Sequence, residues 1–123
     1  MLFRLDFQSA VPIYRQIRDQ VVLAVAKGEL APGEHLPTTR ALAEDAGINV
    51  MTVSKAYQLL KAEGYLAADR RSGAVICAPH RAGTLSADQQ ERLRLLAGEA
   101  RLAGLTQEEF LAQCAAAFAQ KEG

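Results

Sequence analysis

Tryptophan is absent from the chain, and cysteine and histidine occur only twice each. Cys77 and Cys114 lie far apart, and His35 and His80 stand alone, so no metal-ligand spacing is present. Such cysteines predict free thiols in a reducing compartment, the cytoplasm, rather than a disulfide framework. The sequence therefore argues against a metal or redox sensor and predicts no cofactor.

A membrane segment and a set of catalytic residues are also missing. No uncharged apolar run reaches the roughly 18 residues that a transmembrane helix needs. Arg4 and Asp6 lie within the first residues, which predicts that the N-terminus is no secretory signal. No acid, base and nucleophile converge, so neither an enzyme nor a membrane protein is predicted.

Charge of one sign is not in excess, because 14 lysines and arginines balance 14 acidic residues. This balance excludes a polybasic tail protein, but it leaves DNA binding open, since binding needs only a local basic patch. Hydrophobic residues make up 50% of the 123 residues. That fraction is typical of one small folded domain, with some length left for an appendage.

Apolar residues at helical spacing predict three helices in the first part of the chain. The first covers residues 12–27, and the second and third begin after the capping residues Thr38 and Asn49. Leu30 and Leu36, in the turn-rich connector before the second helix, are expected to seal the core. The third helix is expected to bury Val53, Ala56, Tyr57 and Leu60.

The second and third helices have the spacing of a helix-turn-helix. Ala43 is followed four residues later by Gly47 and six residues after that by Val53. The motif needs a small residue where its helices cross, a glycine in the sharp turn and an apolar anchor on the second helix. Its second helix enters the major groove of DNA, whereas an ordinary helical corner would satisfy the same spacing.

A β-hairpin after the third helix favours the winged form of this motif. Residues 65–68 and 74–78 predict two short strands around a polar turn. The tip carries Arg70 and Arg71, side chains suited to phosphates or to a narrow minor groove. In an isolated turn these charges would serve only solubility, but on a wing they favour contact with DNA.

Several segments together carry a family resemblance. They include Pro-Ile-Tyr from position 12 and Asn-Val-Met-Thr-Val-Ser-Lys-Ala-Tyr from position 49. From about Pro12 to Ile76 the chain resembles the GntR family of bacterial transcription regulators, and with its short tail it looks like the YtrA subfamily. The resemblance implies a DNA-binding regulator, by family expectation a repressor, with two C-terminal helices for dimerisation and no large effector-binding domain.

The resemblance also implies DNA-contacting residues. Arg40, preceded by Thr39 in the same motif, matches an arginine that contacts DNA in the family. Many members carry arginine at the positions of Val50 and Ser54, and its absence here fits the YtrA pattern. Positions of the third helix that meet bases and phosphates in the family are Asn49, Val50, Thr52 and Ser54.

The predicted wing departs from the family pattern at one position. Members usually have two glycines around one residue, whereas this chain has Arg71 at the first position and keeps only Gly73. The resemblance implies that the Arg71 side chain takes the place of a close backbone approach to the minor groove.

Helical geometry independently selects residues of the third helix that face DNA. Met51, Ser54, Lys55 and Gln58 point away from the predicted buried stripe. Met51 is expected against a thymine methyl group, and Lys55 against a phosphate or a guanine. Asn49 is expected chiefly as a helix cap, a role that still allows its amide to contact a phosphate.

The C-terminal segment predicts a pair of helices. Ser86 with Gln89, and Thr106 with Glu109, fit the reciprocal capping box. Two helices of this length cannot enclose a pocket of several hundred Å³, so the excess apolar surface favours a homodimer over a purely internal core. The expected dimer interface comprises Leu93, Leu96, Ala100, Phe110, Leu111, Cys114 and Phe118.

The predicted fold class is mainly α with a small β-hairpin. A winged helix-turn-helix DNA-binding domain over residues 1–79 precedes a dimerisation hairpin over residues 80–123. The predicted function is a cytoplasmic transcription regulator, by family expectation a repressor, that binds a near-palindromic double-stranded operator as a homodimer. A winged helix that binds protein instead of DNA is the alternative, which Arg40, Arg70 and Arg71 disfavour. The sequence names neither operator nor effector.

Overall fold

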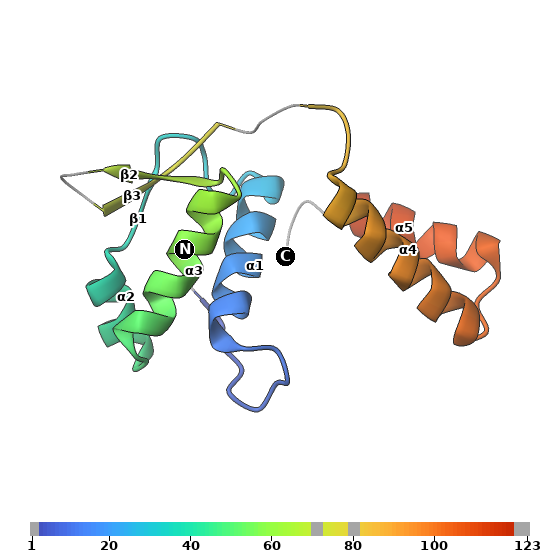
Figure 1. Cartoon of the computed structure of the whole chain (residues 1–123), viewed down its shortest axis with the longest axis horizontal. Helices are drawn as coiled ribbons and strands as arrows, with labels where there is room; N and C mark the ends of the chain where they lie inside the picture. Colours follow the sequence, from blue (N-terminus) through green and yellow to red (C-terminus); the bar gives the residue numbers. More distant parts are fainter. Residues whose placement is uncertain (1–2, 70–72, 79–81, 120–123) are drawn as a thin grey trace. The chain divides into compact units, whose positions relative to one another are not determined.

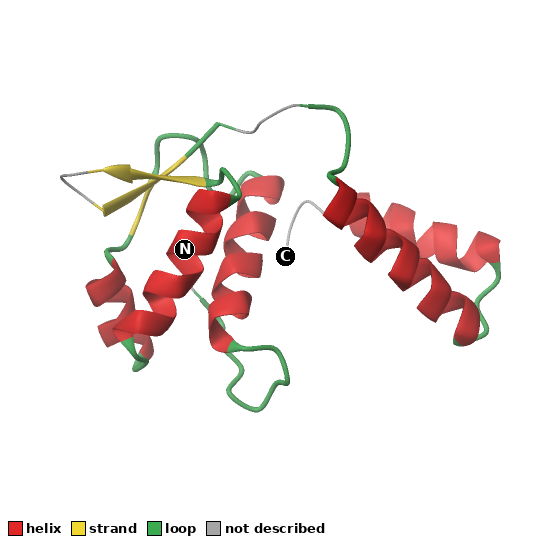
Figure 2. Ribbon diagram, viewed as in Figure 1, coloured by secondary structure: helices red, strands yellow, loops and turns green. Residues whose placement is uncertain are grey.

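The computed structural model describes residues 3–69, 73–78 and 82–119. The chain divides into two compact units, Met1–His80 and Arg81–Gly123. Within the described residues, the first unit contains helices α1 to α3 and a three-stranded sheet, and the second contains α4 and α5 (Figures 1 and 2). The predicted fold class is therefore confirmed. No helix among these residues is long and apolar enough to cross a membrane.

Helix α1 (Ile13–Lys27) begins one residue later than predicted. Pro12 has extended backbone angles, φ −58° and ψ 148°, and its carbonyl accepts hydrogen bonds from the N–H groups of Arg15 and Gln16. It therefore precedes the first turn instead of belonging to it. Gly28 ends the helix in the left-handed conformation, φ 83°, as glycine readily does.

Two glutamines of α1 hold the segment before the helix, which sequence reasoning left without a structure. The Gln20 side chain accepts from the Arg4 N–H (3.0 Å) and donates to the Arg4 carbonyl (2.8 Å). Gln16 does the same for Asp6, at 2.8 and 2.9 Å. Side chains four residues apart on the helix thus pair with backbone groups two residues apart in the segment before it.

Helices α2 (Thr39–Ala46) and α3 (Val50–Ala62) have the predicted caps. The Thr38 hydroxyl accepts from the Ala41 N–H at 3.1 Å, and the Asn49 side chain accepts from the Met51 N–H at 2.7 Å. Gly47 takes the turn between the helices at φ 68°. The helix-turn-helix therefore closes at the predicted residues.

The sheet has the order β1-β3-β2, and both strand pairs are antiparallel. Strands β2 (Leu66–Asp69) and β3 (Gly73–Ile76) form the predicted hairpin, with Leu66 opposite Ile76. Strand β1 (His35–Leu36) was not predicted, because two residues among turn formers show no alternating pattern. It joins the connector before α2 to the hairpin.

The core of the first unit lies between its helices and sheet. Leu30 and Leu36 are 5% and 3% exposed, which confirms that they seal it. The stripe predicted on α3 is buried as well. The largest fully buried side chains are Ile17, Val21, Val53 and Leu60.

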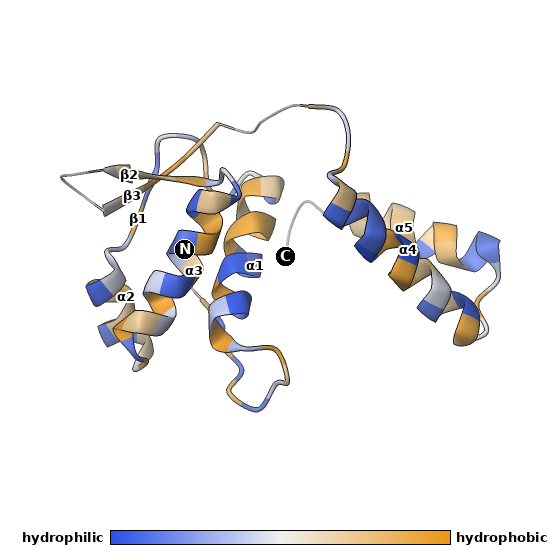
Figure 3. Cartoon of the chain, viewed as in Figure 1, coloured by the Kyte–Doolittle hydropathy of each residue, from blue (hydrophilic) through white to orange (hydrophobic). Residues whose placement is uncertain are grey.

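The second unit consists of α4 (Ala87–Leu102) and α5 (Gln107–Ala119). Both predicted capping boxes are present: Ser86 pairs reciprocally with Gln89, and Thr106 with Glu109. Among the described residues of this unit, only Ala100 is buried. Hydrophobic segments appear along both helices in Figure 3.

Candidate nucleic-acid interface

Helix α3 presents an exposed face opposite its buried stripe. Val53, Ala56 and Tyr57 fix one side of the helix in the core. Met51 lies on the other side with 70% of its surface exposed. Lys55 and Gln58 share this exposed face, and Ser54 is half-buried at its margin. The groove-facing positions expected from helical geometry therefore lie outside the core.

The first turn of α3 is held by its cap. Asn49 is exposed, and its side-chain oxygen is used by the Met51 N–H, which confirms the capping role. Val50 is 39% exposed, whereas Thr52 is half-buried. The cap fixes this first turn, so the side chains at its surface are held on a rigid element.

The start of α2 lies close to the turn end of the β-hairpin, where β3 begins. Arg40 is exposed and Thr39 half-buried on α2. Gly73, at the start of β3, has φ +89°, and a Cβ placed on it would lie 3.7 Å from Cγ2 of Thr38. The expected wing residues Arg70 and Arg71 lie outside the described residues. The start of β3 therefore lies beside the residue that caps α2.

Tyr57 connects α3 to the segment before α2. Its hydroxyl donates a hydrogen bond of 2.7 Å to the carbonyl of Pro37. Burial raises the pKa of the Tyr57 phenol above its ordinary value, so the group stays protonated and remains a donor. Because Pro37 directly precedes the capping residue Thr38, this bond connects the start of α2 to α3.

Lys55 contacts an aromatic ring on α1. Its Nζ lies 4.1 Å from the ring centroid of Tyr14, within the range of a cation–π interaction. Sequence reasoning identified both residues but did not connect them. Their contact depends on how α1 and α3 pack, which spacing along either helix does not specify.

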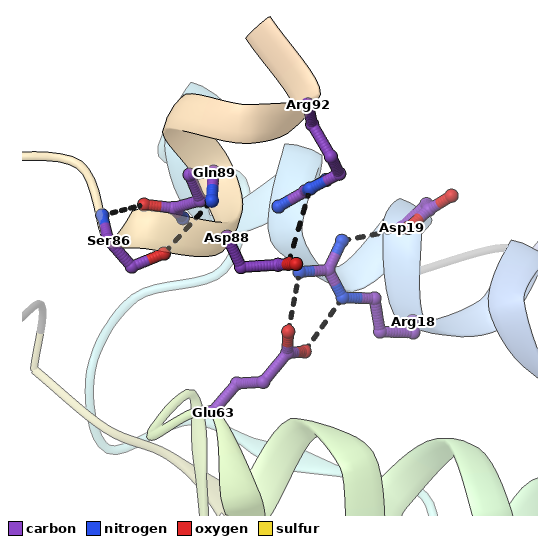
Figure 4. A network of polar contacts seen from close by, with 7 residues as sticks. All are labelled: Arg18, Asp19, Glu63, Ser86, Asp88, Gln89 and Arg92. Carbon is purple, nitrogen blue, oxygen red and sulfur yellow. Dashed lines mark hydrogen bonds and ion pairs between the residues drawn. The ribbon is translucent and has the colours of Figure 1, made fainter. Parts of the chain in front are cut away.

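Arg18 connects α1 to the C-terminal end of α3. Its guanidinium donates to both carboxylate oxygens of Glu63, at 2.8 and 2.9 Å, and to Asp19 at 2.8 Å (Figure 4). The hydrogen bond to Glu63 raises the pKa of Arg18, and burial opposes this shift. Sequence reasoning missed this ion pair between α1 and α3, since the sequence shows Arg18 only as one polar residue within an amphipathic helix.

Most residues expected at a dimer interface are at least partly exposed on α4 and α5. Ala100 is the exception: it is buried at 8% exposure within this unit, so it is not available to a second copy. Leu93, Leu96 and Leu111 are 47%, 53% and 55% exposed, and Phe118 is 94% exposed. Phe110 and Cys114 are half-buried. An open groove between the helices is lined by Thr84, Leu85, Gln90, Leu93, Arg94, Ala97, Phe110, Leu111 and Cys114.

The described residues contain no group of three or more histidine, cysteine, aspartate or glutamate side chains that could hold a metal ion. Cys77 and Cys114 are free thiols, and both are half-buried. No disulfide therefore joins the two cysteines.

Comparison with known proteins identifies the family. The family model described as bacterial regulatory proteins, gntR family, matches residues 13–76. The HTH-type transcriptional regulator Rv1152 of Mycobacterium tuberculosis is 33% identical over 106 residues, which cover 86% of this chain and 85% of that protein. The HTH-type transcriptional repressor YtrA of Bacillus subtilis is 40% identical over 75 residues, 61% of this chain and 58% of that protein.

A solved structure extends the likeness to the whole chain. The transcriptional antiterminator from Listeria monocytogenes EGD-e matches with a TM-score of 0.86 and 28% identity, covering 100% of this chain and 95% of that one. The family model spans more than half of the sequence, and the helix-turn-helix and its hairpin lie within the matched residues. The chain belongs to the gntR family of bacterial regulatory proteins, which are DNA-binding transcription regulators and not enzymes.

Proposed function

We propose that the chain is a cytoplasmic repressor that binds a near-palindromic operator as a homodimer. In this proposal residues 1–79 recognise DNA and residues 80–123 hold two copies together. The similarity to a relative named as a transcriptional repressor supports the direction of regulation. No effector is assigned, and the grooves of the second unit are open hollows on a helical pair.

The exposed face of α3 carries the proposal for DNA recognition. A methionine that is 70% exposed contributes little to folding, whereas in a major groove Met51 would contact thymine methyl groups. Gly73, where β3 begins, lies beside Thr38 at the start of α2, so these two proposed contact regions are neighbours. The proposed contact residues are Thr39, Arg40, Asn49, Val50, Met51, Thr52, Ser54, Lys55, Arg70, Arg71 and Gly73.

Exposed apolar side chains of the second unit support the homodimer. The unit buries only Ala100 among its described residues, although α4 and α5 carry several leucines and phenylalanines. A second copy of the same surface would cover them with two-fold symmetry. Such symmetry relates two recognition helices, so the DNA site would be near-palindromic, with half-sites about one helical turn or a multiple of it apart.

Selection of bound duplexes from a random pool would test this function. An enriched near-palindrome is expected, and Arg40→Ala should weaken its binding by about 1–3 kcal/mol if Arg40 pairs with a base edge. Arg92→Ala is the matched control, because Arg92 is exposed on α4, outside the groove between the helices, and forms an ion pair with Asp88. Absence of any enriched duplex would favour the alternative, a winged helix that binds protein.

A reporter gene placed behind the selected site would test repression. Expression should fall when the protein is present and recover with Arg40→Ala. A rise in expression would contradict the proposed direction while leaving operator binding intact.

A further inference from the structure

Lys55 has one described partner, and that partner leaves its hydrogen-bond donors free. The Nζ of Lys55 lies 4.1 Å from the ring centroid of Tyr14. Within the described part of the chain, no carboxylate forms an ion pair with it. A cation held over a ring face keeps its positive charge, and the ammonium N–H groups that point away from the ring can donate to an anion.

Tyr14 is held more firmly than Lys55. It is the second residue of α1 and is half-buried, with its ring packed against the hydrophobic core. Lys55 is exposed and has a flexible four-carbon stem, which loses rotamer freedom when the ammonium binds a fixed partner. The ring therefore restricts the lysine before any DNA arrives, which is how preorganisation raises affinity.

We propose that Tyr14 is a positioning residue, whose ring holds the Lys55 ammonium for a DNA phosphate. This inference rests on the proposed entry of α3 into the major groove. Met51, Lys55 and Gln58 share the exposed face of α3, but the Lys55 side chain reaches over the Tyr14 ring on α1, which brings its ammonium to the side of that face. Base edges lie at the centre of a major groove and phosphates at its sides, so a marginal ammonium meets the backbone.

The salt dependence of binding measures this role directly. Each phosphate neutralised contributes about 0.9 to the slope of log K against log salt concentration. Lys55→Met removes the charge and should reduce the magnitude of this slope by about that amount for each bound copy. Tyr14→Leu removes the ring and leaves the charge. This variant should reduce the magnitude of the slope by less than Lys55→Met does, and should weaken DNA binding about 2- to 5-fold.

The matched control is Tyr14→Phe, which keeps the ring and removes only the hydroxyl. Its slope should equal that of the unaltered protein. The double variant Tyr14→Leu with Lys55→Met should bind like Lys55→Met alone, because a positioning residue acts only through its partner. All the slopes can be measured by fluorescence anisotropy with the selected duplex, at salt concentrations from about 50 to about 200 mM.

Three results would overturn the positioning role while the unaltered protein still binds. They are an unchanged slope in Lys55→Met, additive losses in the double variant, or a Tyr14→Phe slope as low as that of Tyr14→Leu. The last would assign the effect to the hydroxyl. If Tyr14→Leu does not fold by circular dichroism, Tyr14→Met gives the same comparison. Failure of the proposed function appears differently, as loss of binding by the unaltered protein itself.

Discussion

Glu63 closes the C-terminal end of α3 and accepts two hydrogen bonds from the guanidinium of Arg18 on α1. The pair is asymmetric, because the Arg18 side chain is 9% exposed and that of Glu63 is 31% exposed. A buried guanidinium costs free energy when its partner is removed, whereas a carboxylate near the surface recovers solvation. The pair therefore orients α3 against α1.

Glu63→Ala is expected to lower the free energy of unfolding by about 1–2 kcal/mol, a value discounted for the partial exposure of the carboxylate. Asp19→Ala is the matched control, since Asp19 is 45% exposed and accepts only one bond from the same guanidinium. It should cost less than about 1 kcal/mol. Urea denaturation measures both, and equal losses would contradict the dominant role of Glu63.

Two substitutions at Asn49 separate capping from DNA contact. Asn49→Ala removes the acceptor for the Met51 N–H and should destabilise the fold by about 0.5–2 kcal/mol. Asn49→Asp keeps an acceptor that is favourable at a helix N-terminus, so stability should stay near that of the unaltered protein. Its negative charge beside the phosphates should nevertheless weaken DNA binding. Thermal denaturation and anisotropy would show the two effects apart, and undiminished DNA binding by Asn49→Asp would exclude nearby phosphates.

Tyr57→Phe tests the hydrogen bond that connects the start of α2 to α3. Loss of the donor to the Pro37 carbonyl should cost about 0.5–1.5 kcal/mol in the free energy of unfolding. The pKa of Tyr57 is raised in the folded protein. The stabilisation that its protonated hydroxyl gives is therefore fully present below the ordinary pKa of about 10 and is lost as pH rises above that value. Denaturation at neutral and alkaline pH should therefore show that the difference in free energy of unfolding between the unaltered protein and Tyr57→Phe becomes smaller at high pH. A difference in free energy of unfolding that does not change with pH would contradict this role of the Tyr57 hydroxyl.

Local signals in the sequence predicted most of the fold correctly. The caps Thr38 and Asn49, the turn at Gly47 and the buried stripe of α3 depend on residues close together in the chain, where capping and periodicity act directly. The same local rules placed the hairpin and both capping boxes of the second unit.

Contacts between distant elements could not be predicted this way. Arg18 and Glu63 are 45 residues apart, and neither differs locally from an ordinary surface charge. The Tyr14–Lys55 contact and strand β1 likewise depend on how α1 packs on α3 and how the connector meets β3. On the candidate interface, the sequence could nominate Lys55, but only the packing of α1 reveals what holds it.

The capping box of α5 predicts a pH dependence confined to the second unit. The hydrogen bond from the Thr106 backbone lowers the pKa of Glu109, and the hydrogen bond with the Thr106 side chain lowers it by a smaller amount. A carboxyl whose pKa is lowered by folding stabilises above its unfolded pKa, and this contribution is lost as pH falls through the folded pKa. Helicity of α5, followed by NMR, should therefore decrease in acid.

Glu109→Gln should remove this titration while keeping an amide oxygen for the cap. Glu108→Gln is the control, because Glu108 lies in the same first turn of α5 but is not part of the capping box. It should retain the acid transition. An identical transition in the Glu109 variant would assign the pH dependence to another group.

The exposed face of α5 offers the strictest test of the homodimer. Leu111 is 55% exposed and lines the groove between the two helices, so Leu111→Asp should introduce a desolvated charge into a two-copy interface and convert the protein to monomers. Leu23→Asp is the matched control, since Leu23 is 56% exposed on α1, outside the proposed interface. Light scattering at micromolar concentration should give a dimer mass for the unaltered protein and the control only. Loss of the second copy also removes the effective concentration that couples two half-sites, so the Leu111 variant should bind the operator about 100-fold or more weakly. A monomer mass for the unaltered protein, with operator binding intact, would refute the dimer and the palindrome together.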